Sequence, residues 1–247
     1  MKLISPLNTV FALLFSGLLG SGATYAQSNF YKFGLGAGFG VTQSFGDVYN
    51  KGTSYSAFTS VDYYLTPHIN FGLEYQQGKI VGGNKNDSTV YYRQFRNDYR
   101  ALLGQVKVQL GVLINYQRNG FLNTIRGLYV GTGLGFINNK HKNRVGVWED
   151  EDGTIVEVFP GTAKSKEVFL PISVGINFYY PDLIGTNRLI LNFNYQTNIC
   201  FGEGLDSYDN SANSFRTGVP DMYVFLSAGL KYQFGFVGLS RNSFRKF

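Results

Sequence analysis

The chain has 247 residues, a formal net charge of +6 and an unusual abundance of glycine, tyrosine and phenylalanine. With 44% hydrophobic, 17% aromatic and only 15% charged residues, its composition favours β-strands over amphipathic helices. The single cysteine, Cys200, excludes an internal disulfide framework.

Residues 1–26 have the pattern of a secretory signal peptide. Lys2 precedes an apolar run over 10–20, and Thr24 and Ala26 fit the small-x-small cleavage pattern. That run is too short to span a membrane comfortably, and no later run approaches the roughly 18 apolar residues that a spanning helix needs. The sequence therefore predicts an exported chain.

The first segment after the signal peptide, YKFGLGAGFGVT at 31–42, carries glycine at every second position from 34 to 40. A dinucleotide-binding G-x-G-x-x-G motif would need a further glycine where Phe39 or Val41 stands, so a phosphate-binding loop is excluded. The period of two instead predicts a strand with one apolar face and one nearly bare face.

Seven further segments repeat this alternation. Each sets apolar residues against glycine or polar residues over about 9–14 positions, the length that a tilted membrane-spanning strand needs. The seven segments are 55–65, 69–79, 100–113, 128–137, 168–179, 188–198 and 223–236.

The connections between these segments differ in length in a regular way. Short or middling connections alternate with long polar ones. The shorter connections are 66–68, a link through Asn119-Gly120 and 180–187. The long connections are 43–54, 80–99, 138–167 and 199–222. Outer-membrane barrels have short periplasmic turns and long extracellular loops. The predicted fold is all-β: an eight-stranded antiparallel transmembrane up-and-down β-barrel over 27–236, with a basic periplasmic tail over 237–247.

The two faces of the predicted strands indicate which one meets lipid. The polar faces hold few charges, and turning them outward would put Lys107 or Lys231 into hydrocarbon at about 2–4 kcal/mol each. The apolar face carries aromatic residues near both strand ends, as membrane interfaces select. These are Phe33, Tyr63, Phe71, Phe178, Tyr232 and Phe234 on the periplasmic side and Phe39, Tyr55, Tyr75, Phe136 and Tyr195 on the other.

Glycine on the inward face makes room in a narrow barrel. Eight strands enclose a lumen only just wide enough for side chains, so bare positions at 34–40 and 131–135 allow larger neighbours such as Phe58, Tyr64 and Tyr129. We therefore interpret these glycines as packing positions.

The glycine strand YKFGLGAGFG, the phrase LPISVGINFYY at 170–180 and the closing AGLKYQFGF at 228–236 resemble the small outer-membrane barrels of the OmpA-barrel and OmpX type, particularly those common in Bacteroidetes. The resemblance covers about 28–236 and implies an outer-membrane location. That family includes porin-like, adhesive, structural and enzymatic members, so no single activity is implied. Its last strand usually ends in an aromatic residue recognised by the barrel assembly machinery, a role open here to Phe236 or Phe247.

The inward-facing charges form the first candidate site, a polar cluster of the lumen: Lys32, Asp62, Glu74, Lys107 and Lys231. Opposite charges in a narrow lumen are expected to pair, because an unpaired buried charge is costly. The favoured interpretation is a structural plug of salt bridges and amides, and the alternative is an ion-selective constriction.

The second candidate site is a basic and aromatic stretch in the predicted second loop. Arg93, Arg96 and Arg100 would lie just above the outer aromatic belt, where lipopolysaccharide presents phosphates. An exported location argues against nucleic acid as the partner. The simpler interpretation is an ordinary solvated loop.

The third predicted loop contains WEDEDGT at 148–154, which has the central glycine of a calcium loop. Trp148 and Phe159 would occupy its first and last ligand positions and cannot ligate, so no metal site is predicted. Asp152-Gly153 is instead a strong tight-turn dipeptide and predicts a β-hairpin.

No catalytic residues are predicted. The two histidines, His68 and His141, lie in connections without an evident nucleophile beside them, and no cofactor motif occurs. We expect a non-enzymatic integral outer-membrane protein with a structural or binding role through its extracellular loops, for a ligand that the sequence does not name. The alternative is a narrow porin-like channel for ions or small solutes, and a lipid-modifying or proteolytic barrel enzyme ranks third.

Overall fold

The structure is a computed structural model that describes residues 29–45, 51–83, 91–112, 122, 125–149, 155–158, 163–182, 187–202, 204–206 and 221–239. The predicted signal peptide, 1–26, lies outside these ranges. Its elements are β1 (Asn29–Phe45), β2 (Thr53–Thr66), β3 (Ile69–Gly82), β4 (Tyr91–Gln109), the 3₁₀ turn η1 (Leu110–Val112), β5 (Leu128–Glu149), β6 (Ile155–Val158), β7 (Lys164–Pro181), β8 (Asn187–Cys200) and β9 (Met222–Leu239).

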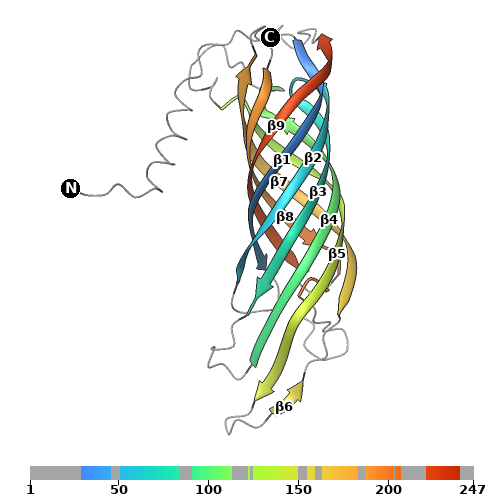
Figure 1. Ribbon diagram of the computed structural model, residues 1–247, viewed down its shortest axis with the longest axis vertical. Coiled ribbons are helices and arrows are strands. Elements are labelled where there is room, and N and C mark those ends of the chain that lie inside the picture. The colour runs from blue at the N-terminus through green and yellow to red at the C-terminus, as the bar shows by residue number, and fades with distance from the viewer. Residues whose placement is uncertain are drawn as a thin grey trace, which may run out of the picture.

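Eight of the strands form a closed ring. β1 pairs with both β2 and β9, and the ring continues from β2 through β3, β4, β5, β7 and β8 back to β9, every pair being antiparallel. β6 pairs with β5 alone and stands outside the ring (Figure 1). The predicted eight-stranded antiparallel up-and-down barrel is thus confirmed.

Seven of the predicted segments lie wholly within strands, and these strands run longer than their periodicity predicted. The eighth, 100–113, is strand only as far as Gln109, where β4 gives way to η1, and its last residue lies outside the described ranges. β4 and β5 extend farthest because they continue to pair with each other, as far as Tyr91 opposite Trp148. Parts of the connections predicted at 80–99 and 138–167 are therefore strand. This ladder projects from the end of the barrel opposite to the start of β1 and the end of β9 (Figure 1).

The hairpin predicted around Asp152-Gly153 is present as the pairing of β5 with β6, in which Val147 lies opposite Val158; its tip lies outside the described residues. The connection 110–127 is longer than 46–52 or 83–90. The predicted alternation of short and long connections therefore fails there, because strand pairing takes up residues that were assigned to loops.

β9 contains a bulge near its end. The pairing of β1 with β9 shifts register between Tyr31 and Phe33, and Gly235, on β9 at this place, has a φ of 91°, which glycine adopts without strain. Beyond the bulge β9 continues to Leu239. The barrel boundary predicted at 236 is thus too early, and 237–239 belong to the strand rather than to the tail.

The core of the protein lies inside the ring. Phe58, Tyr64 and Tyr129 point inward and are buried, as predicted. A Cβ placed on Gly38 would lie 2.7 Å from Cε1 of Phe58, and one on Gly34 would lie 3.2 Å from Cε2 of Tyr64. The glycines therefore provide the space that these rings fill.

Candidate functional site

The outer wall of the barrel is an apolar band. Leu, Val, Phe and Tyr side chains point outward on every strand of the ring, and Phe39 and Tyr55 are 76% and 79% exposed. Near the starting end of β1, strand register aligns Phe234, Phe33, Tyr63 and Phe71 in one row across β9, β1, β2 and β3. Such a surface is suited to hydrocarbon, whereas a water-soluble barrel would present a charged wall.

Inside this wall lie two ion pairs. Lys231 Nζ is 2.6 Å from Asp62 Oδ2, and Lys107 Nζ is 3.8 Å from Glu74 Oε2. All four side chains are buried. Asn70 donates to Asp62 Oδ1 over 2.8 Å, so both carboxylate oxygens of Asp62 are bonded. Because positive and negative charges are equal in number, the lumen is electrically balanced at this level.

Glycines give the two lysines their space. A Cβ on Gly36 would lie 2.8 Å from Cγ of Lys231, and one on Gly131 would lie 2.9 Å from Cγ of Lys107. The Lys231 chain thus crosses β1 at Gly36 to reach Asp62 on β2. The periodic glycines therefore make room for the ion pairs as well as for aromatic rings, a role that their spacing alone did not indicate.

A layer of amides continues the network. Gln76 donates to Glu74 Oε1 over 2.8 Å. Across the lumen, Gln105 donates to Gln196 over 3.3 Å and accepts a hydrogen bond from Ser173 over 2.7 Å. Asn192, Asn194 and the Tyr129 hydroxyl form a second group at 2.9–3.0 Å. These bonds join inward polar side chains of β3, β4, β5, β7 and β8 to one another inside the barrel.

Toward the β6 end the interior becomes apolar. Buried rings meet there at centroid distances of 5.5–6.1 Å, with Tyr223 contacting both Tyr99 and Phe169. The cluster comprises Ile80, Phe95, Tyr99, Ala101, Leu103, Ile137, Phe169, Cys200, Leu205 and Tyr223. Leu205 comes from the described segment 204–206 between β8 and β9, and its burial shows that this segment folds back onto the interior from that side.

Hydrogen bonds hold the closing segment, 204–206, in place. Asn97 donates to the Leu205 carbonyl over 3.1 Å, and Ser165 donates to the Gly204 carbonyl over 2.8 Å. The Leu205 N–H donates to Asp221 over 3.1 Å. His141 Nε2 lies 3.0 Å from the Gly204 carbonyl, which gives this histidine a structural contact.

We expect Leu205→Ala to loosen this closing segment without opening the ion-paired layer. Losing a buried leucine side chain costs about 2–5 kcal/mol where the site cannot collapse. The free energy needed to open this segment locally should fall by a corresponding amount. Hydrogen exchange should accelerate in peptides covering 95–103 and 200–206 while peptides covering 69–78 keep wild-type protection. Equal acceleration in both regions would contradict a local closing role.

The structure brings together four of the five predicted lumen residues. Lys32 is the exception, since it is half-buried nearer the start of β1 and takes part in neither ion pair. Neither the apolar cluster nor the burial of Leu205 within it was predicted from the sequence. The inward parity of Phe95, Tyr99 and Leu103 along β4 could have indicated the cluster, but an isolated leucine in a polar connection gives no periodic pattern.

The predicted arginine site lies on a strand rather than in a loop. Arg96 and Arg100 project outward from β4, while the Arg93 backbone belongs to β4 and its side chain lies outside what is described. Between them Asp98 pairs with Lys142 at 2.6 Å and with Arg96 at 3.8 Å. The hydrogen bond from Lys142 holds the pKa of Asp98 below its ordinary value, so this carboxylate is ionised at neutral pH.

The β2–β3 turn holds the other histidine. Burial lowers the pKa of His68, so its imidazole is neutral at physiological pH. In the part of the chain that is described, no group of three or more His, Cys, Asp or Glu side chains could hold a metal ion. Over the same ranges, no helix is long and apolar enough to cross a membrane.

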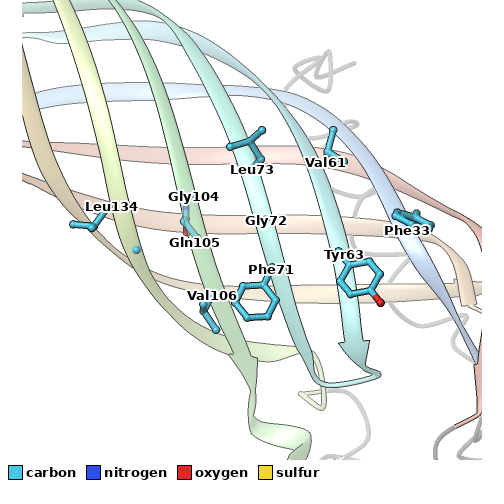
Figure 2. Close-up of a pocket in the computed structure, with 11 residues that line it drawn as sticks. Phe33, Val61, Tyr63, Phe71, Gly72, Leu73, Gly104, Gln105, Val106 and Leu134 are labelled. Carbon is cyan, nitrogen blue, oxygen red and sulfur yellow. The ribbon is translucent and has the colours of Figure 1, made fainter.

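The outer wall has a hollow of about 640 Å³ beside Gly104. Figure 2 shows Phe71, Leu73, Val106 and Leu134 around it, with Val61, Tyr63 and Phe33 farther along the wall. A Cβ on Gly104 would meet nothing within 4 Å, so the hollow exists because this outward position has no side chain. It is an apolar indentation of the outer wall and carries no catalytic group.

No family model and no curated protein matches this chain. Solved structures do, and they are small eight-stranded outer-membrane barrels. Neisserial surface protein A is 12% identical, with 82% of this chain and 97% of that one covered at a TM-score of 0.47. The attachment invasion locus protein Ail of Yersinia pestis, solved with the heparin analogue sucrose octasulfate, is 11% identical. The match covers 82% of this chain and 99% of that one, with a TM-score of 0.41. OprG of Pseudomonas aeruginosa is 9% identical, and the match covers 84% of this chain and 99% of that one, with a TM-score of 0.37. These likenesses concern architecture alone.

Proposed function

We propose that the chain is an integral outer-membrane protein whose barrel is sealed and whose role is structural or binding, exercised at its extracellular end. The observation that carries this proposal is the inverted distribution of polarity: an exposed apolar wall surrounds buried ion pairs, amides and aromatic rings. In this orientation the β6 end is extracellular and the β2–β3 turn is periplasmic. A sealed interior leaves the loops and outer wall as the functional surfaces.

Export through the predicted signal peptide and insertion by the barrel assembly machinery belong to the same proposal. Phe236, near the end of β9, is 80% exposed on the outer wall, which suits an aromatic residue that the machinery recognises. We propose that the structural or binding role of the chain is non-enzymatic.

A narrow channel is the second candidate function, and the charged layer is the observation that favours it. An ion entering the barrel would have to pass between Lys107, Glu74, Asp62 and Lys231. Their pairing at 2.6 and 3.8 Å, together with the Leu205 segment, opposes such a passage. The two functions therefore make opposite predictions for conductance.

We expect the refolded mature chain to show no discrete conductance in planar bilayers, after a heat-modifiable gel shift has established that the barrel is closed. Because the lumen is filled, neither Lys107→Gln nor the surface control Lys51→Gln should produce channel events. Discrete openings of the wild type whose ion selectivity changes in Lys107→Gln, but not in Lys51→Gln, would overturn the sealed barrel and support the channel.

A further inference from the structure

Basic side chains gather on one side of the outer wall near the β6 end. They project outward from β3, β4, β5 and β7 and are exposed or half-exposed. We call them the basic patch: Lys79, Arg96, Arg100, Lys140, Lys142, Lys164 and Lys166. Asp98 is the one acidic residue that the described part of this surface contributes, and Glu167, on β7, faces inward instead.

Strand register places the members of the patch side by side. Lys79, Asp98, Lys140 and Lys164 occupy successive positions of one row across the four strands. The neighbouring row contains Gln77, Arg100, Asn138 and Lys166. Since adjacent strands lie about 4.8 Å apart, each anion on this wall would be within reach of several cations.

The patch has a defined depth relative to the apolar band. The next outward residues along the same strands are Tyr75, Leu102, Phe136 and Val168, which are exposed and mutually aligned. The nearest cations therefore lie one repeat of the strand, roughly 7 Å, beyond the hydrophobic wall. That depth corresponds to lipid headgroups, and the side chains point sideways from the barrel.

The patch is also confined to one side. On β1, β2, β8 and β9, the described outward residues beyond the apolar band are uncharged, for example Gln43, Thr53, Thr197 and Val224. Lys51, just before β2, is the described cation nearest to the patch on this side, and its ammonium stands 4.1 Å from the centre of the Phe45 ring. A general need to meet a polar interface would distribute charge around the whole circumference. A one-sided arrangement favours a bound ligand.

Asp98 holds two cations of the patch in place and leaves most of its positive charge uncompensated. Its carboxylate contacts Lys142 at 2.6 Å and Arg96 at 3.8 Å, whereas Arg100 and Lys166 form no ion pair with another described residue. Guanidinium groups bind phosphate through paired hydrogen bonds, and ammonium groups add positive charge. The guanidinium and ammonium groups of the patch are therefore suited to binding phosphate.

We propose that the basic patch binds the phosphate groups of an outer-leaflet glycolipid, lipopolysaccharide, on the β3–β7 side of the barrel. This inference rests on the membrane placement proposed above. It extends the arginine pair of β4 to lysines on three further strands. A soluble polyanion such as a sulfated glycan is the competing ligand, but it would not require the patch to adjoin the apolar band.

The test compares Arg100→Gln/Lys166→Gln with Lys32→Gln/Arg126→Gln, a control that removes equal charge at the opposite end of the barrel. Native mass spectrometry of the folded barrel in detergent would measure binding of deep-rough lipopolysaccharide and of the same lipid after removal of its phosphates. We expect the patch variant to bind the phosphorylated lipid about tenfold more weakly than the wild type, since charge-assisted hydrogen bonds are lost. The control variant should bind like the wild type, and the dephosphorylated lipid should bind weakly to all three.

Equal binding by the patch variant and the wild type, or equal binding of both lipids, would overturn the inference. So would a sulfated oligosaccharide that binds the wild type more tightly than the lipopolysaccharide does and depends on the same two residues. The membrane placement is checked separately by the heat-modifiable shift and by insertion into lipid vesicles. A chain that fails there removes the proposed function, whereas a folded barrel without phosphate dependence removes this inference alone.

Discussion

Replacing Lys231 with methionine is expected to destabilise the folded barrel by about 3–5 kcal/mol, the cost of leaving a buried charge without its partner. Asp62 lies in the lumen with no exposed surface, and Lys231 Nζ is 2.6 Å from its Oδ2. Asn70 bonds the other oxygen but supplies no positive charge. The loss should appear as a lower urea midpoint in lipid vesicles, followed by circular dichroism and the heat-modifiable gel shift.

The double variant Asp62→Asn/Lys231→Met separates the ion pair from simple packing. Removing both charges leaves no buried ion, and such replacements are often nearly neutral, so stability should return to within about 1–2 kcal/mol of the wild type. Lys79→Met, which changes an exposed lysine on the outer wall, should alter stability by less than about 0.5 kcal/mol. A double variant as unstable as Lys231→Met would show that the lysine stem, rather than its charge, stabilises the lumen.

Gly40→Ala is expected to cost about 3 kcal/mol or to prevent insertion altogether, because the added carbon meets backbone rather than a movable side chain. A Cβ there would lie 2.6 Å from Cα of Ser227 and also against the Leu226 carbonyl, on the neighbouring β9. Relief would require β1 and β9 to separate along the seam that closes the ring.

Gly104→Ala provides the matched control for this substitution. It adds the same carbon to another strand, but the added Cβ has no neighbour within 4 Å and projects into the hollow of the outer wall. We expect its folding yield and urea midpoint to equal or slightly exceed those of the wild type, since alanine restricts the unfolded chain more than glycine does. Equal losses in both variants would mean that any methyl group disturbs the strand, whatever its surroundings.

The barrel could be predicted from the sequence because its two faces meet different surroundings. Wherever a strand has hydrocarbon on one side and a filled lumen on the other, alternation is enforced, as in the glycine strand at 31–42. The same argument correctly placed Asp62, Glu74, Lys107 and Lys231 inside. It could not identify their partners, because Lys231 meets Asp62 across an intervening strand, and that contact depends on the register of ring closure.

The strand extensions and the closing segment do not lie between hydrocarbon and a filled lumen, so nothing imposes an alternating pattern on their residues. Beyond the apolar band the outward face of β4 carries Arg96, Asp98 and Arg100, so polar residues occur on both faces and the period of two weakens. Leu205 is held by hydrogen bonds from Asn97 and to Asp221, residues far away in the sequence. Contacts of that kind have no local pattern, which is why 80–99 was assigned to a loop and the burial of Leu205 was not predicted.

The path of Lys231 across Gly36 has a consequence for assembly. Lys231 is on the last strand and Asp62 is on the second, so the two charges meet only when β9 has docked on β1. An open sheet would hold an unneutralised carboxylate near one edge and an unneutralised ammonium near the other. Sealing the seam and cancelling these charges are therefore a single event, which penalises half-closed forms within a membrane and makes the final step of folding all-or-none.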